Sequence, residues 1–188
     1  MSDEVATLEG TAETDGEELP PLQRVLLPSP LGSLGLDFRG ETITRFVIVP
    51  ERKERKHYQP LGDIDRSEFL DEALGRLLEY FAGARLQLKL DFELSSSGLD
   101  EFSQRVLLAT SEIPYGETRT YQKLASFVGA PDSYRLVRSI LVGNPLPILL
   151  PCHRVVPRKG GAGSYVAGTK KKEWLLKMEK RALEEREG

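Results

Sequence analysis

The chain has 188 residues, of which 39% are hydrophobic and 7% aromatic, values that suit a soluble globular protein with one ordinary domain or two small ones. Its longest apolar stretch is far shorter than the roughly 20 residues that a membrane span needs, and its N-terminus lacks the basic-then-apolar pattern of a signal peptide. Its single cysteine excludes an internal disulfide. We therefore expect a cytoplasmic protein, or a nuclear one in a eukaryote, with no membrane partner.

The net charge of -3 conceals a segregation of charge along the chain. Residues 1–21 carry seven acidic and no basic side chains, residues 22–98 carry 12 acids and 11 bases, and residues 99–188 carry 10 acids and 15 bases. The last segment is basic enough to attract a polyanion such as a nucleic acid. A solvated surface of mixed charge explains the same counts equally well.

Changes in composition predict a tail and two domains. Residues 1–21 are acidic and poor in large apolar side chains, so we expect a disordered tail. Residues 22–94 predict a small sheet-and-helix domain, the serine-rich residues 95–99 a linker, and residues 100–188 a helical domain. The expected fold class is α/β (α+β), with a small N-terminal antiparallel sheet.

Short β-type runs open the N-terminal domain. The runs at 24–27, 33–38 and 43–49 are separated by glycine-containing turn signals, a pattern that predicts an antiparallel meander. Alternating apolar residues predict one more strand over 86–94.

A polar loop over residues 51–65 precedes the first predicted helix. Ser67 is a typical N-cap residue, and Gly83 ends the helical pattern. The face that this helix should bury is formed by Phe69, Leu70, Leu74, Leu77, Leu78 and Phe81.

Four helices are predicted in the C-terminal domain, at about 102–109, 121–128, 131–141 and 170–183. The second and third are short and separated by Gly129-Ala130-Pro131, which is the outline of a helix-turn-helix. The residues expected to face inward from the third and last helices are Tyr134, Val137, Leu141, Trp174, Leu175 and Met178.

The only cysteine, Cys152, lies in the segment Pro151-Cys152-His153-Arg154. A thiol in this position is either a buried spacer or a nucleophile, and the polar pair that follows favours the nucleophile. His153 is the obvious base, but neighbouring side chains of an extended chain point to opposite faces. A bent backbone or a bridging water is therefore needed, and the four nearby prolines make a regular strand unfavourable.

Other candidate sites carry weaker signals. Glu179 lies at the edge of the buried face of the last helix and could orient an imidazole, although pairing with a lysine of its own helix is the more ordinary explanation. One cysteine and two histidines do not make a common zinc set, so we expect no metal. The glycine-rich residues 160–163 lack the lysine of a phosphate-binding loop and predict a flexible wall beside the thiol.

These motifs, taken in order, resemble the O6-alkylguanine-DNA alkyltransferases, also called methylated-DNA-protein-cysteine methyltransferases. The resemblance extends over about residues 101–181. The segments that carry it are Ile113-Pro114-Tyr115-Gly116-Glu117-Thr118, Gly143-Asn144-Pro145-Leu146-Pro147-Ile148, Pro151-Cys152-His153-Arg154-Val155-Val156, Gly163-Ser164-Tyr165 and Lys172-Glu173-Trp174-Leu175-Leu176.

The resemblance implies a role for each residue of the active site. Cys152 would accept the alkyl group, His153 would draw its proton through a water, and Glu179 would hold the imidazole. Asn144 matches the family's hinge between the helix-turn-helix and the active-site segment. Tyr165 matches the tyrosine that hydrogen-bonds the guanine ring as it leaves.

The same resemblance assigns the DNA-binding residues and the substrate pocket. Tyr121 would crowd a phosphate so that the nucleotide rotates out, and Arg135 would fill the gap in the duplex. Arg138 and Ser139 stand where the family usually has small residues, so Arg138 would contact phosphate or hold the helix further out. The residues that would line the pocket are Pro147, Val155, Val166 and Lys172, with Val166 narrowing it against bulky adducts.

The implied function is repair of O6-alkylguanine, mainly O6-methylguanine, in double-stranded DNA. The protein would flip the base out, transfer the alkyl group irreversibly to Cys152, and react once, as a monomer without a cofactor. A lesion binder, a transcriptional regulator and a cysteine hydrolase are the alternatives. Related lesion binders lack the cysteine, the regulators carry additional domains, and nothing here offers water a route to cleave the thioether.

Overall fold

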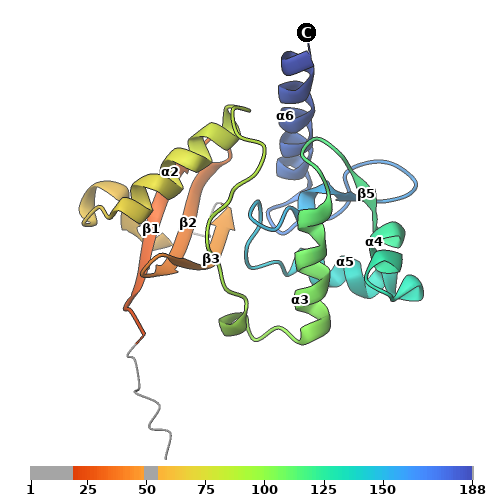
Figure 1. Cartoon of the computed structure of the whole chain (residues 1–188), viewed down its shortest axis with the longest axis horizontal. Coiled ribbons are helices and arrows are strands. Elements are labelled where there is room, and N and C mark those ends of the chain that lie inside the picture. The colour runs from red at the N-terminus through yellow and green to blue at the C-terminus, as the bar shows by residue number, and fades with distance from the viewer. Residues whose placement is uncertain (1–18, 49–54, 188) are drawn as a thin grey trace, which may run out of the picture.

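The computed structural model describes residues 19–48 and 55–187. The predicted acidic tail up to residue 18, and residues 49–54 of the predicted third strand and loop, lie outside these ranges. Two halves lie side by side: a small sheet with a helix on one face, and a group of helices that follows it in sequence (Figure 1). The expected α+β fold class is confirmed, whereas the division into two domains with a linker stays a prediction.

The N-terminal sheet contains β1 (Leu22–Ser29), β2 (Gly32–Arg39), β3 (Thr42–Ile48) and β4 (Gln59–Pro60), in the order β3-β2-β1-β4. The first three strands form the predicted antiparallel meander. The short β4 pairs in parallel with β1, where only loop was predicted. Proline is tolerated there because β4 is an edge strand.

Helix α2 (Glu68–Phe81) covers the sheet, and the side chain of Ser67 caps it by accepting a hydrogen bond from the backbone of Leu70. Its buried residues are Phe69, Leu70, Ala73, Leu77 and Tyr80. The prediction that Leu78 is buried is wrong, since that side chain is 52% exposed. Tyr80 follows the buried Leu77 by three positions and so lies on the inward face of the helix, whereas Leu78, the residue directly after Leu77, points away from that face.

The strand predicted over residues 86–94 does not form. The chain is irregular there and touches β3 at one bridge, between Phe92 and Ile43. Further along β3, its free edge pairs with the C-terminal half instead: the backbone N–H of Phe46 donates a hydrogen bond to the carbonyl of Pro145 at 2.8 Å. The alternating leucines instead pack against the core without a continuous partner strand. The serine-rich residues that follow form a short 3-10 helix, Ser95–Ser97.

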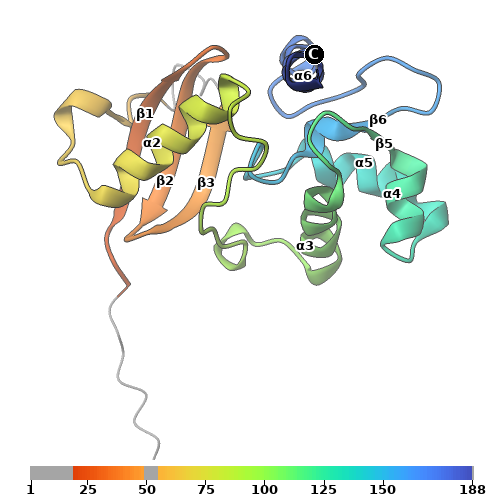
Figure 2. The ribbon, with the colours of Figure 1, turned by 45° about the horizontal axis from the view of Figure 1, so that its top comes forward.

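The C-terminal half contains α3 (Glu101–Leu108), α4 (Tyr121–Phe127), α5 (Tyr134–Val142) and α6 (Thr169–Glu187), close to the predicted ranges. Helices α4 and α5 are neighbours joined by a tight turn, as a helix-turn-helix requires (Figure 2). Two short strands, β5 (Arg119–Thr120) and β6 (Val155–Val156), pair in parallel beside them. Within the described residues, no helix combines the length and apolar character that crossing a bilayer requires.

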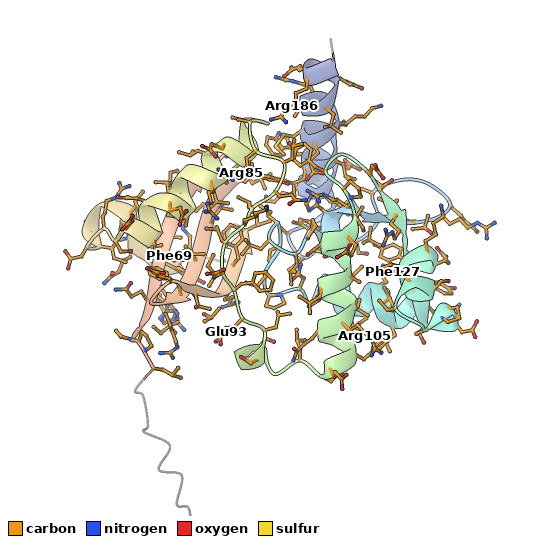
Figure 3. The ribbon with its side chains drawn as sticks, in the orientation of Figure 1. Phe69, Arg85, Glu93, Arg105, Phe127 and Arg186 are labelled. Atoms are coloured by element: carbon orange, nitrogen blue, oxygen red, sulfur yellow. The ribbon has the colours of Figure 1, made fainter. Side chains whose placement is uncertain are left out.

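Helix α6 reaches back to the N-terminal half at the end of α2. The guanidinium of Arg186 donates to the carbonyl of Ala84 at 2.6 Å, and Figure 3 labels Arg186 and the neighbouring Arg85 on the two sides of this contact. Trp174 was predicted to face inward but is 37% exposed, and its ring lies over Phe81 with centroids 6.1 Å apart.

We expect Gly83→Ala to weaken this junction. Gly83 has a φ of 73°, and a Cβ added there would lie 2.6 Å from the Cβ of Ala182 on α6. The matched control is Gly98→Ala, because Gly98 has a φ of 69° and open space around it. Urea denaturation should show a loss of about 1 kcal/mol for the control, from backbone strain alone, and roughly 1–3 kcal/mol more for Gly83→Ala. Equal losses would contradict close packing between α2 and α6.

Candidate active site

The backbone around the cysteine is irregular and wraps around one side chain. Asn144 accepts a hydrogen bond from the backbone of Leu146 at 2.9 Å and donates one to the carbonyl of Leu150 at 2.8 Å. Between them, Ile148 has a φ of 78°, a left-handed conformation that is strained for a β-branched residue. The segment then turns into a short 3-10 helix, Cys152–Arg154. This bend is the kind of backbone that the prolines predicted.

The thiol of Cys152 is almost completely enclosed, with 2% of the residue exposed. The same Asn144 amide that holds the loop also donates to Sγ at 3.1 Å. Burial raises the pKa of the thiol to about 11, although the Asn144 hydrogen bond and the charge of Lys172 act in the opposite direction. The resting cysteine is therefore protonated at neutral pH. For the sulfur to act as a nucleophile, a base must remove this proton.

His153 and Glu179 form a fully buried pair, in which the imidazole Nε2 lies 2.8 Å from the carboxylate Oε1. Burial opposes ionisation of the carboxyl group, but His153 and Arg154 outweigh it and hold the pKa of Glu179 well below its usual range. Burial lowers the pKa of His153, which leaves the imidazole neutral at pH 7. Since Nε2 donates to the carboxylate, the lone pair lies on Nδ1, which has no hydrogen-bond partner within the described part of the chain. His153 is thus arranged to accept a proton at Nδ1.

Further donors complete the surroundings of Glu179. Arg154 donates from Nε to Oε2 at 3.0 Å and from Nη2 to Oε1 at 2.9 Å. Tyr80 of α2 donates its hydroxyl to Oε1 at 2.6 Å, and the backbone of Gly116 donates to Oε2 at 3.0 Å. The ordinary explanation, an edge glutamate paired with a lysine of its own helix, is wrong. Arg154 and Tyr80 were not assigned roles from the sequence, and Tyr80 could not have been, since it comes from the other half.

Lys172 and Tyr165 form a second buried group of the site. Lys172 is 1% exposed and donates to the carbonyls of Val155 at 2.5 Å and Ser164 at 3.2 Å. Burial lowers its pKa to about 8, so it remains largely charged at pH 7. Tyr165 is also buried, and its hydroxyl has no hydrogen-bond partner in the described ranges. An unpaired buried hydroxyl costs about 1–3 kcal/mol, so Tyr165 offers a donor to an incoming ligand.

Two of the predicted pocket residues line a cavity of about 240 Å³ between the halves. Pro147 and Val166 form part of its wall, and Phe46 and Ile48 of β3 form another part. Val166 is 42% exposed, so this part of the wall faces solvent. Val155, in contrast, is fully buried and contributes its carbonyl to Lys172 rather than a wall of this cavity. The described residues contain no group of three histidine, cysteine or carboxylate side chains close enough to hold a metal ion.

The predicted DNA-binding residues are not all on the surface. Arg135, Arg138 and Ser139 are exposed on α5. Tyr121 is 5% exposed, and its hydroxyl points inward to within 3.5 Å of the Lys172 amine. The geometry therefore places the three α5 residues where a duplex could meet them and places Tyr121 beneath that surface.

The site and the fold together define a class of protein: a helix-turn-helix domain that encloses a single cysteine, followed in sequence by an imidazole that a buried carboxylate orients. Comparison with known proteins gives the same answer. Residues 101–181 match the family model described as 6-O-methylguanine DNA methyltransferase, DNA binding domain.

Relatives and solved structures extend the match over most of the chain. Methylated-DNA--protein-cysteine methyltransferases of Mycobacterium leprae (strain TN) and Methanosarcina barkeri (strain Fusaro / DSM 804) are 36% and 41% identical to it, covering 82% and 84% of this chain and 90% and 97% of their own. The crystal structure of Mycobacterium tuberculosis O6-methylguanine methyltransferase superposes with a TM-score of 0.74 at 32% identity, covering 86% of this chain and 94% of that one. The structure of the Mycobacterium tuberculosis protein in complex with DNA gives a TM-score of 0.74 at 34% identity, covering 85% and 94%. The chain belongs to the methylated-DNA--protein-cysteine methyltransferase family.

Replacing the buried carboxylate should cost stability in a pH-dependent way. Because the folded pKa of Glu179 lies below its unfolded value of about 4.3, its contribution is present above that pH and is lost as the pH falls below it. At pH 7 we expect Glu179→Gln to lose roughly 3–5 kcal/mol, since Arg154 is left without its counter-ion. In urea unfolding the difference from the unchanged protein should begin to shrink below about pH 5 and keep shrinking as the pH falls toward the depressed pKa of the folded state.

The control for that experiment is Glu184→Gln on the same helix, where an exposed carboxylate lies 3.7 Å from Lys180. Exposed pairs contribute about 0–1 kcal/mol. Should Glu179→Gln fail to fold, Tyr80→Phe removes a single donor to the same carboxylate and should give a smaller loss. A cost for Glu179→Gln no larger than the control's at pH 7 would contradict the interpretation of Glu179 as the buried counter-ion of Arg154.

Proposed function

We propose that this protein repairs DNA by moving the alkyl group of O6-alkylguanine, mainly O6-methylguanine, onto Sγ of Cys152, irreversibly and once per molecule. The observation that carries the proposal is the enclosed thiol of Cys152, which accepts a hydrogen bond from Asn144. The next residue in sequence is His153, whose imidazole Nε2 is hydrogen-bonded to Glu179. Family membership supports the reaction class, and the geometry supports the assignment of roles.

The first step is activation of the thiol. His153 accepts the thiol proton at Nδ1 through a bridging water, and Glu179 stabilises the imidazolium that results. Asn144 donates to the sulfur and so stabilises the thiolate as it forms. The charge of Lys172 acts in the same direction. The buried resting state keeps the thiol protonated until a substrate arrives.

The second step is displacement at the alkyl carbon. The new bond joins Sγ to that carbon, the bond between the carbon and O6 of guanine breaks, and the electron pair goes to the guanine. Tyr165 donates its unpaired hydroxyl to the ring and so stabilises the leaving base. The backbone of Cys152, Val155 and Val166 reads the edge of the base. A thioether is not reversed by water or an ordinary thiol, so each molecule reacts once, and no cofactor is needed.

The lesion is delivered by base flipping. The O6 position is inaccessible within a stacked duplex, and extrusion costs a few kcal/mol, less for a poorly paired base. Helix α5 presents Arg135 to fill the gap, while Arg138 and Ser139 lie on the same exposed surface. Pro147 and Val166 form the side of the substrate pocket next to Asn144, which lines the same cavity and donates to the thiol. Tyr121, being buried, acts on the phosphate only after a local rearrangement.

The remaining parts of the proposal concern partners and location. Double-stranded DNA containing O6-alkylguanine is the partner, bound by one copy of the protein. The proposed compartment is the cytoplasm, or the nucleus in a eukaryote.

The reaction can be tested by mass. Incubation with duplex DNA containing O6-methylguanine should add one methyl group to the peptide that bears Cys152, and transfer should stop at one methyl per protein. Cys152→Ser is the control, because it keeps the size of the side chain and removes the sulfur. An unmodified Cys152 peptide after prolonged incubation, or product beyond one equivalent, would rule out the proposed chemistry.

The assignment of Arg135 can be tested by comparing substrates. Arg135→Ala should slow repair in duplex DNA much more than reaction with the free base O6-methylguanine, because only the duplex contains a gap to be filled. Arg105→Ala removes an exposed guanidinium from α3, where it lies over Phe102, and should affect neither substrate. Equal losses on both substrates would show that α5 does not act through the duplex.

A further inference from the structure

An unusual contact joins the helix-turn-helix to the active-site loop. The guanidinium Nη2 of Arg138, on the exposed face of α5, donates to the hydroxyl Oγ of Ser164 at 2.6 Å. Ser164 directly precedes Tyr165, whose buried hydroxyl is the proposed donor to the guanine ring. Arg138 and Ser164, which are 26 positions apart in sequence, thus connect the proposed DNA-binding surface of α5 with Tyr165, the proposed guanine-binding residue.

The same loop is anchored on its other side by α6. The Lys172 amine donates to the carbonyl of Ser164 at 3.2 Å, and the Thr169 hydroxyl donates to the carbonyl of Gly163 at 3.1 Å. Gly163 and Gly168 have φ values of 75° and 90°, so the loop turns sharply on both sides of Tyr165. Its backbone is held to α6, whereas the Ser164 side chain provides its connection to α5.

The charge of Arg138 also acts on the buried part of the site, because burial raises the pKa of Tyr121 and the positive charge of Arg138 opposes that rise. A small residue at position 138, as the resemblance leads one to expect, could not span from α5 to this loop. The contact is therefore a property of this chain's own side chains.

We propose that Arg138 is a positioning residue: through Ser164 it fixes the loop that carries Tyr165 relative to α5, so that docking of α5 on the duplex sets the guanine pocket. The inference rests on the proposed alkyl transfer and goes beyond a phosphate contact by Arg138. A phosphate contact would add affinity for DNA, whereas this coupling changes the rate at which bound substrate reacts.

The test separates rate from affinity. Single-turnover alkylation of duplex DNA containing O6-methylguanine is measured at increasing protein concentrations, with the protein always in excess over the DNA. The dependence of the rate on protein concentration gives a dissociation constant and a limiting rate constant. The variants compared are Arg138→Ala, Ser164→Ala and the double variant. We expect each single variant to lower the limiting rate constant about fivefold, the effect of one such hydrogen bond. The double variant should fall no further, because both changes break the same contact. Ser164→Thr keeps the hydroxyl and should retain the rate.

Arg158→Ala is the matched control, since it removes one exposed positive charge from the segment that follows the cysteine. It should leave the limiting rate constant unchanged. Two results would overturn the inference: a Ser164→Ala variant with an unchanged limiting rate constant, or an Arg138→Ala variant that only weakens binding in a salt-dependent way. Absence of alkyl transfer in the unchanged protein would instead refute the proposed function itself.

Discussion

The ionised carboxylate of Glu179 is the group on which the rest of this structure depends. A buried charge is tolerated only when hydrogen bonds and an opposite charge replace its hydration. Here the donors come from α2, from the loop after α3 and from the 3-10 helix of the cysteine, so that one side chain of α6 connects both halves. The hydrogen bonds that this carboxylate accepts fix the orientation of His153. The same set of hydrogen bonds also joins the two halves of the molecule.

The enclosure of Cys152 fits the proposed single reaction of this protein. Burial makes the thiolate unfavourable in the resting state, and so protects the sulfur from the oxidation and side reactions that an exposed low-pKa thiol attracts. The groups that would stabilise the thiolate, Asn144 and Lys172, are already in place and need no reorganisation. Among the described residues, two unpaired atoms of the site, Nδ1 of His153 and the hydroxyl of Tyr165, are suited to hydrogen bonds with a water and a base.

Local patterns predicted those elements whose formation depends on local physics. The meander follows from alternation and turn glycines, and α2 begins at its serine cap, because these signals act within a few residues. Predictions that required knowledge of neighbours were less successful. The segment expected to be a strand at 86–94 pairs with β3 only at Ile43, and further along the edge of β3 is occupied by Pro145. Trp174 is partly exposed, while Leu175 and Glu179 are the buried residues of that part of α6.

The sequence by itself determined the family and the outline of the helix-turn-helix, and it predicted Cys152 as the nucleophile, because one cysteine in an ordered set of motifs leaves few alternatives. Only the tertiary structure decided that Glu179 is a buried counter-ion, that Tyr80 of the other half donates to it, and that Arg138 reaches Ser164. The physical reason is that a side chain's charge state and partners depend on burial and on residues distant in sequence. Neither is encoded in the spacing of its neighbours along the chain.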